Sequence, residues 1–167
     1  IANVSKGYID IRGIGYCSCT GIVSGVIVEM ESVCKSISTA VELAEAQARS
    51  RVKSAYVSIS GKNVISRIDK CSSEIGGRLV TQEDINKMLY REAQVTPGHV
   101  IIHKIPIMFT IDDLPGIKNP VGMVADLLER QMSVIEAPKA QVNNLFVCLS
   151  KSHIEVDGIV ASHYASG

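Results

Sequence analysis

The chain has 167 residues, of which 46% are hydrophobic and 20% charged, and its 17 basic and 17 acidic side chains give a formal net charge of zero. This length predicts one domain or two small ones, and the balanced charge gives no basis for a nucleic-acid partner or an anionic membrane surface. No apolar run approaches the ~20 residues of a membrane span, and no signal peptide is visible. Because the chain begins at Ile1 instead of Met, we expect it to be a piece of a longer protein.

The chain contains five cysteines, and they lie inside apolar-patterned segments. An odd number in such positions predicts reduced, buried thiols and a cytosolic location. Cys17 and Cys19 form a close pair, but no second ligand pair follows at the spacing of a zinc finger. We therefore expect no metal site.

The first third of the chain predicts a strand, a helix and a second strand. Ile9 and Ile11 alternate as in a half-buried strand, and Gly13 and Gly15 indicate a bulge or a close backbone neighbour. Residues 29–49 repeat apolar side chains at steps of three and four, which is typical of an amphipathic helix. Residues 55–60 alternate as a strand, so this part predicts an α/β layer.

A turn at residues 60–63 marks the first boundary, and residues 64–75 after it predict a polar-rich strand. We expect Gly76 and Gly77 to end this strand. Thr81 and Asp84 then predict the capping-box start of a helix that runs to about Ala93.

The strongest predicted strand covers residues 100–111. Pro106 cannot donate a ladder hydrogen bond, so the strand should lie at an edge or be bulged there. His103 shares the apolar face, where a hydrogen-bonded core histidine is the expected role.

Residues 112–123 predict a long, shaped loop, because two prolines and two glycines exclude a regular helix or a central strand. Lys118 and Asn119 precede Pro120 and should be extended. The loop also carries apolar side chains that we expect to be buried, namely Leu114, Ile117, Val121 and Met123.

Residues 127–137 fit both a helix and a strand, and local propensity favours the helix. Pro138 suits the first position of a helix that runs to about Lys151. Residues 153–162 predict a strand, and residues 164–167 an open end.

Residues 116–123, read Gly-Ile-Lys-Asn-Pro-Val-Gly-Met, resemble a signature of the FtsA family, actin-like proteins of bacterial cell division. Weaker similarities lie at 55–61, 80–85, 103–106, 109–112, 156–157 and 161–162. The resemblance implies an α/β fold with an α+β insert and favours a strand at 127–137. Residues 1–61 and 138–167 would form part of an actin/Hsp70-like (ribonuclease H-like) subdomain, called 1A. Residues 62–137 would form an inserted sheet-plus-helix subdomain of SHS2 type, called 1C.

The resemblance also implies a function, because FtsA proteins tether FtsZ filaments to the membrane and recruit later division proteins. Subdomain 1C is implicated in self-assembly and in this recruitment, so the implied partners are further copies of the protein and divisome proteins such as FtsN. FtsZ and the membrane would be contacted only through parts missing here. The implied location is cytoplasmic, and for the full-length protein the cytoplasmic face of the inner membrane at the septum.

The family's nucleotide site uses two Asp-containing glycine turns, which cradle phosphate and hold Mg²⁺. Neither turn is in this chain, so we expect no enzyme activity and no cofactor here, and ATP with Mg²⁺ only in the full-length protein. Candidate partner-binding residues are polar side chains expected on the outer surface of 1C: Lys118, Asn119, Glu129 and Arg130.

Three alternatives stay open. An actin-like ATPase or kinase would need acidic groups near a glycine turn, for which Asp112-Asp113 and Asp157-Gly158 are the nearest matches. The others are a pilus-assembly relative of FtsA and a thiol or metal protein.

Overall fold

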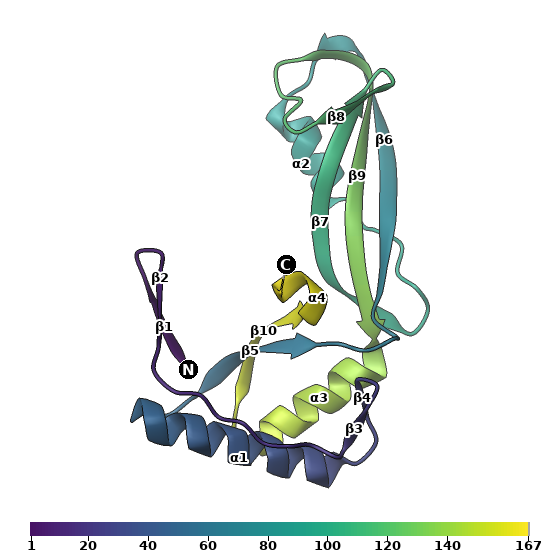
Figure 1. Cartoon of the computed structure of the whole chain (residues 1–167). Coiled ribbons are helices and arrows are strands. Elements are labelled where there is room, and N and C mark those ends of the chain that lie inside the picture. The colour runs from purple at the N-terminus through teal and green to yellow at the C-terminus, as the bar shows by residue number, and fades with distance from the viewer. Residues whose placement is uncertain (167) are drawn as a thin grey trace. The chain divides into compact units, whose positions relative to one another are not determined.

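The computed structural model of the protein describes residues 1–166 and divides into two compact units. The split unit contains residues 1–64 together with the segment that begins at Pro138. The inserted unit contains residues 65–137, so it begins at Ile65, where the sequence suggested Lys62. Each unit is described by itself below (Figure 1).

The split unit is built around two parallel strands, β5 (Ser54–Ile59) and β10 (Glu155–Ala161). Helices α1 (Met30–Ala48) and α3 (Lys139–Lys151) pack against each other beside these strands (Figure 1). The predicted helix at 29–49 is confirmed, with Glu29 and Arg49 as its caps. Pro138 is the N-cap residue of α3, whereas the sequence predicted it at the first helical position. The short helix α4 (Ser162–Ala165) replaces the expected open end, and Gly167 lies outside the described residues.

The N-terminal segment differs from the expected half-buried strand. Strands β1 (Ala2–Ser5) and β2 (Tyr8–Ile11) form a hairpin whose residues are all exposed. Ile9 and Ile11 are 71% and 64% exposed, because the hairpin pairs only with itself among the described residues. A second small hairpin joins β3 (Ile22–Val23) and β4 (Val26–Ile27).

Gly13 and Gly15 do have the close backbone neighbour that the sequence indicated. A Cβ at Gly13 would lie 2.1 Å from the carbonyl oxygen of Ala44, and one at Gly15 would lie 1.6 Å from that of Ala40. Both distances are far below van der Waals contact, so only glycine lets this segment lie against α1. The spacing of the two glycines therefore fixes how the segment follows the helix.

The inserted unit is a four-stranded sheet with the order β6-β9-β7-β8. Its strands are β6 (Ile65–Leu79), β7 (His99–Ile111), β8 (Leu114–Ile117) and β9 (Val124–Pro138). Helix α2 (Gln82–Tyr90) lies along one face of this sheet (Figure 1). The core between helix and sheet consists of Ile75, Val80, Ile85, Met88, Phe109, Ile111, Ala125 and Leu128.

The start of α2 follows the predicted capping box. The backbone N–H of Asp84 donates to Thr81 Oγ1 at 3.2 Å, and the backbone N–H of Thr81 donates to the Asp84 carboxylate at 2.9 Å. Arg78 adds two hydrogen bonds to the same carboxylate, at 2.7 and 2.8 Å. The helix ends at Tyr90, earlier than the expected Ala93, although Ala93 is buried.

Two predicted breaks prove to be local irregularities inside the sheet. Gly76 and Gly77 have φ angles of 70° and 73°, and the β6–β9 register shifts there, but β6 continues to Leu79. They form a bulge inside the strand. The expectation that they would end the strand was therefore wrong. The loop at 112–123 likewise contains β8, which pairs with the end of β7.

Pro106 lies in β7 before the part of that strand that β8 covers, since the β7–β8 pairs are confined to residues 109–117. One side of β7 therefore lacks a ladder partner at Pro106 within residues 1–166. The strand is an edge at this point, as the proline predicted. The ambiguous segment 127–137 is part of β9, a strand, as the family resemblance favoured.

Candidate interaction surface

Three of the four predicted contact residues lie on the surface of the inserted unit. Lys118, Asn119 and Glu129 are exposed. The Asn119 side-chain oxygen accepts a hydrogen bond from the backbone N–H of Val121 at 3.2 Å, which shapes the loop after β8. Neither Lys118 nor Glu129 forms an ion pair within residues 1–166, so both charges are available to a partner.

Arg130 is the exception, and its assignment to the outer surface was wrong. Its side chain is 1% exposed, because in β9 it shares the covered face with Leu128 and Met132. Arg130 forms an ion pair with Asp69 on the neighbouring strand β6, and its Nη1 lies 3.5 Å from the sulfur of Met132. It therefore stabilises the interior of the sheet and cannot touch a partner.

Arg130 belongs to a buried charged network that the sequence pattern did not reveal. Arg67 donates to Glu136 at 3.0 Å and approaches Asp69 at 3.5 Å, and the backbone N–H of Thr96 donates to Glu136 at 3.1 Å. Burial acts to raise the pKa of Glu136, but the hydrogen bonds from Thr96 and Arg67 outweigh it and lower this pKa. The network thus keeps a fully buried carboxylate ionised.

Three of the four apolar side chains of the loop that were expected to be buried are exposed. Leu114 is 62% exposed, and Val121 and Met123 are each 38% exposed, whereas Ile117 packs on the core. Leu79 and Val124 lie opposite each other in the β6–β9 ladder and are 56% and 61% exposed. Exposed apolar side chains gathered at one end of a small unit are typical of a protein contact.

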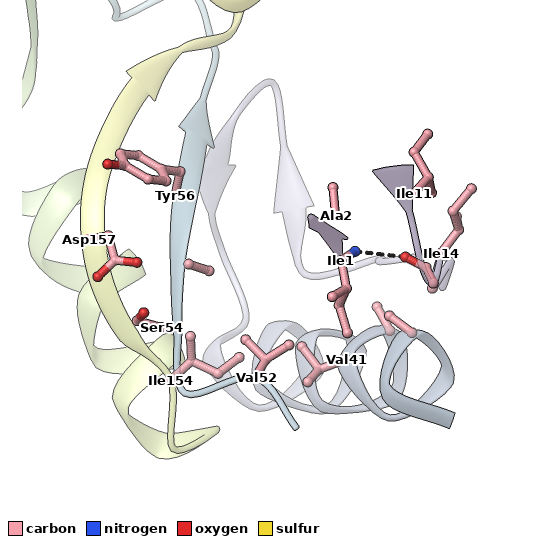
Figure 2. Close-up of a pocket in the computed structure, with 15 residues that line it drawn as sticks. Ile1, Ala2, Ile11, Ile14, Val41, Val52, Ser54, Tyr56, Ile154 and Asp157 are labelled. Atoms are coloured by element: carbon pink, nitrogen blue, oxygen red, sulfur yellow. Dashed lines mark hydrogen bonds between the residues drawn. The ribbon is translucent and has the colours of Figure 1, made fainter. Parts of the chain in front are cut away.

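The split unit holds a cavity of about 710 Å³ between α1, the N-terminal segment and the strands β5 and β10. Figure 2 shows Tyr56 and Asp157 at one side of this cavity and Ile1 and Ile14 at the other. The amino group of Ile1 donates to the carbonyl of Gly13 at 2.7 Å. Most of the lining is apolar, and no group of three or more His, Cys, Asp or Glu side chains within residues 1–166 could hold a metal ion.

The cysteines are all free thiols in the described chain, but only Cys148 is fully buried. Burial, followed by its hydrogen bond with Cys34, raises the pKa of the Cys148 thiol to about 11. The other four are half-buried, so the prediction of buried thiols holds for Cys148 alone. No helix within residues 1–166 is long and apolar enough to cross a membrane.

Known proteins resemble the chain over nearly its whole length. The family model of the SHS2 domain inserted in FtsA matches residues 45–136, which is more than half of the chain. The cell division protein FtsA of Agrobacterium fabrum is 33% identical over 161 residues, covering 95% of this chain and 36% of that protein. FtsA of Escherichia coli K12 is 29% identical over 167 residues, covering 96% of this chain and 39% of that protein.

A solved structure shares the fold. A chain of the PilM–PilN type IV pilus biogenesis complex matches with a TM-score of 0.55 and 16% identity, covering 89% of this chain and 39% of that one. The expected fold class, a partial actin-like α/β subdomain with an inserted SHS2 domain, is thereby confirmed. The chain spans well under half the length of the relatives it matches. It belongs to the FtsA family of bacterial cell-division proteins, whose SHS2 domain it carries as an insert.

Proposed function

We propose that the chain serves cell division as a docking module, and that its inserted unit supplies the surface for self-assembly and for recruiting later divisome proteins such as FtsN. The observation that carries this proposal is the family match over residues 45–136, which covers most of the inserted unit. The exposed apolar end of that unit and the exposed charges of Lys118 and Glu129 support it, because apolar contact area with flanking charges is what a protein interface requires.

For the full-length protein we propose the scaffold role implied by the family: tethering FtsZ to the cytoplasmic face of the inner membrane at the septum. FtsZ and the membrane would then be contacted by parts outside this sequence. ATP and Mg²⁺ would be bound by the full-length protein, and this chain would act without a cofactor and without catalysis.

A pull-down with cytoplasmic tails of division proteins tests the docking role. We expect the double variant Lys118→Glu/Glu129→Lys to weaken capture severalfold, because it inverts both exposed charges without changing the net charge. The matched control Lys139→Glu/Glu42→Lys makes the same exchange at exposed positions of the split unit and should bind as the native chain does. Equal capture by all three proteins would exclude this surface, and no capture at all would exclude the role.

The non-enzymatic role is tested separately by heating the chain with ADP or ATP and Mg²⁺. We expect no rise in the unfolding temperature, since a ligand stabilises only a fold that binds it. Protection by either nucleotide would favour the actin-like ATPase alternative.

A further inference from the structure

Strand β6 is the outermost strand on one side of the inserted sheet, and it is 15 residues long. Its only ladder partner within residues 1–166 is β9, so one row of backbone N–H and C=O groups faces away from the sheet. Such an edge is a template for pairing with another strand. This strand contains no proline, and its bulge at Gly76 and Gly77 lies only near its end.

A hollow lies beside part of this edge. A cavity of about 480 Å³ is lined on one side by residues 69–72 of β6 and on the other by Arg91, Glu92 and Gln94. No backbone hydrogen bond joins the segment 91–98 to β6 in the described chain. The segment therefore does not complete the ladder on this side of β6, where a paired strand would lie about 4.8 Å away in the hydrogen-bonding direction.

The exposed residues of β6 are complementary to themselves. If two copies pair antiparallel with Ser72 opposite Ser72, Lys70 of each copy lies opposite Glu74 of the other. Lys70, Ser72 and Glu74 alternate along the exposed face, and neither charge has an ion-pair partner within residues 1–166. Lys70 and Glu74 are both diagonal to Glu129 of β9, which pairs with Ser72, so within one copy Glu74 lies near a second carboxylate and gains from a lysine directly opposite it.

Neighbouring registers lack this match. If the two-fold axis that relates the two copies passed through Lys70, Lys70 of one copy would lie opposite Lys70 of the other, which is destabilising. An axis at Ile68 would pair Arg67 with Asp69, but Arg67 is already bonded to Glu136, and Asp69 to Arg130. The axis at Ser72 uses the charges that remain available.

We propose that two copies of the chain associate through their β6 edges, antiparallel about Ser72, to form one continuous sheet. This inference rests on the proposed self-assembly role and specifies the surface and register that it uses. The bulge at Gly76 limits the paired stretch to about residues 69–75, so the contact is small and the dimer is reversible.

Charge exchange tests the register. Sedimentation equilibrium should show a concentration-dependent dimer of the native chain. Lys70→Glu or Glu74→Lys alone should weaken the dimer on the order of tenfold, because each change makes two like-charge pairs. The double variant Lys70→Glu/Glu74→Lys should restore it. Lys87→Glu on the exposed face of α2 is the charge-matched control and should dimerise normally.

Cross-linking gives a second, independent readout. Directly opposed strand residues have Cα atoms about 4.5–5.5 Å apart, within disulfide range. In a Cys71→Ser background, Ser72→Cys should form a covalent dimer on mild oxidation, whereas Ser66→Cys on the same strand face should not.

A native chain that stays monomeric, or single charge variants that dimerise as well as the native chain, would overturn the inference. If monomeric chain still captures division-protein tails, the edge pairing fails while the docking role stands. If the chain dimerises through β6 but captures no tail, the recruitment role fails and the edge pairing stands.

Discussion

Arg130 shows how a charged side chain can belong to the interior of a small sheet. It lies between Leu128 and Met132 on the covered face of β9 and is neutralised by Asp69 of β6. Alternation along a strand places Arg130 on the same side as Leu128 and Met132. The assumption that a charge is solvated led to the wrong surface assignment.

We expect Arg130→Met to lower the free energy of unfolding by about 3 kcal/mol, because the Asp69 carboxylate, with only 16% of its side chain exposed, loses its closest partner. The double variant Arg130→Met/Asp69→Leu removes both charges and should lose less. Urea denaturation followed by circular dichroism measures both, and Glu129→Ala, on the exposed face, should change stability by less than about 0.5 kcal/mol. Equal losses in the single and double variants would contradict the ion-pair account.

At the scale of elements, local sequence chemistry predicted starts and types better than ends. The Thr81–Asp84 capping box was readable because it depends on neighbouring residues. For Gly13 and Gly15 the sequence indicated a bulge or a close backbone neighbour, and only the structure shows that this neighbour is α1. The bulge at Gly76 was not readable, since only pairing with β9 carries β6 beyond it. The exposed β1–β2 hairpin was missed because alternation does not reveal whether another element covers a strand.

The start of α2 also gives a pH prediction. Hydrogen bonds from Arg78, and then from the Thr81 side chain and backbone, hold the pKa of Asp84 well below its usual range. A carboxyl whose pKa is lowered by folding adds stability above its unfolded pKa of about 4, and this stability is lost as the pH falls below that value. Asp84→Asn should therefore lose less stability than the native chain as the pH falls below about 4.

Thermal unfolding of both proteins between about pH 2 and pH 7 measures this difference. Thr81→Ala should cost about 1 kcal/mol at neutral pH by removing the cap. An unchanged acid slope in Asp84→Asn would show that other carboxylates, such as Glu136, dominate the acid response.

At the scale of the whole molecule, the chain consists of two units, each with its own hydrophobic contacts. The insertion could be anticipated from the family resemblance, whereas the position of the β6 edge could not, because strand order follows from tertiary pairing. The polar alternation of Lys70, Ser72 and Glu74 was nevertheless a visible sign of a strand with one solvent-facing side.

Residues 65–137 expressed alone should fold, because the core formed by α2 and the sheet draws on no residue outside this range. At this size the stability should be only a few kcal/mol, so we expect a cooperative urea transition at low denaturant concentration. Dispersed amide resonances in a two-dimensional NMR spectrum would establish a unique fold. Buried Leu128→Ala should abolish that dispersion, since it opens a cavity costing about 2–5 kcal/mol, whereas exposed Leu114→Ala should retain it. If the fragment without substitutions is unfolded, the inserted unit depends on the split unit for its stability.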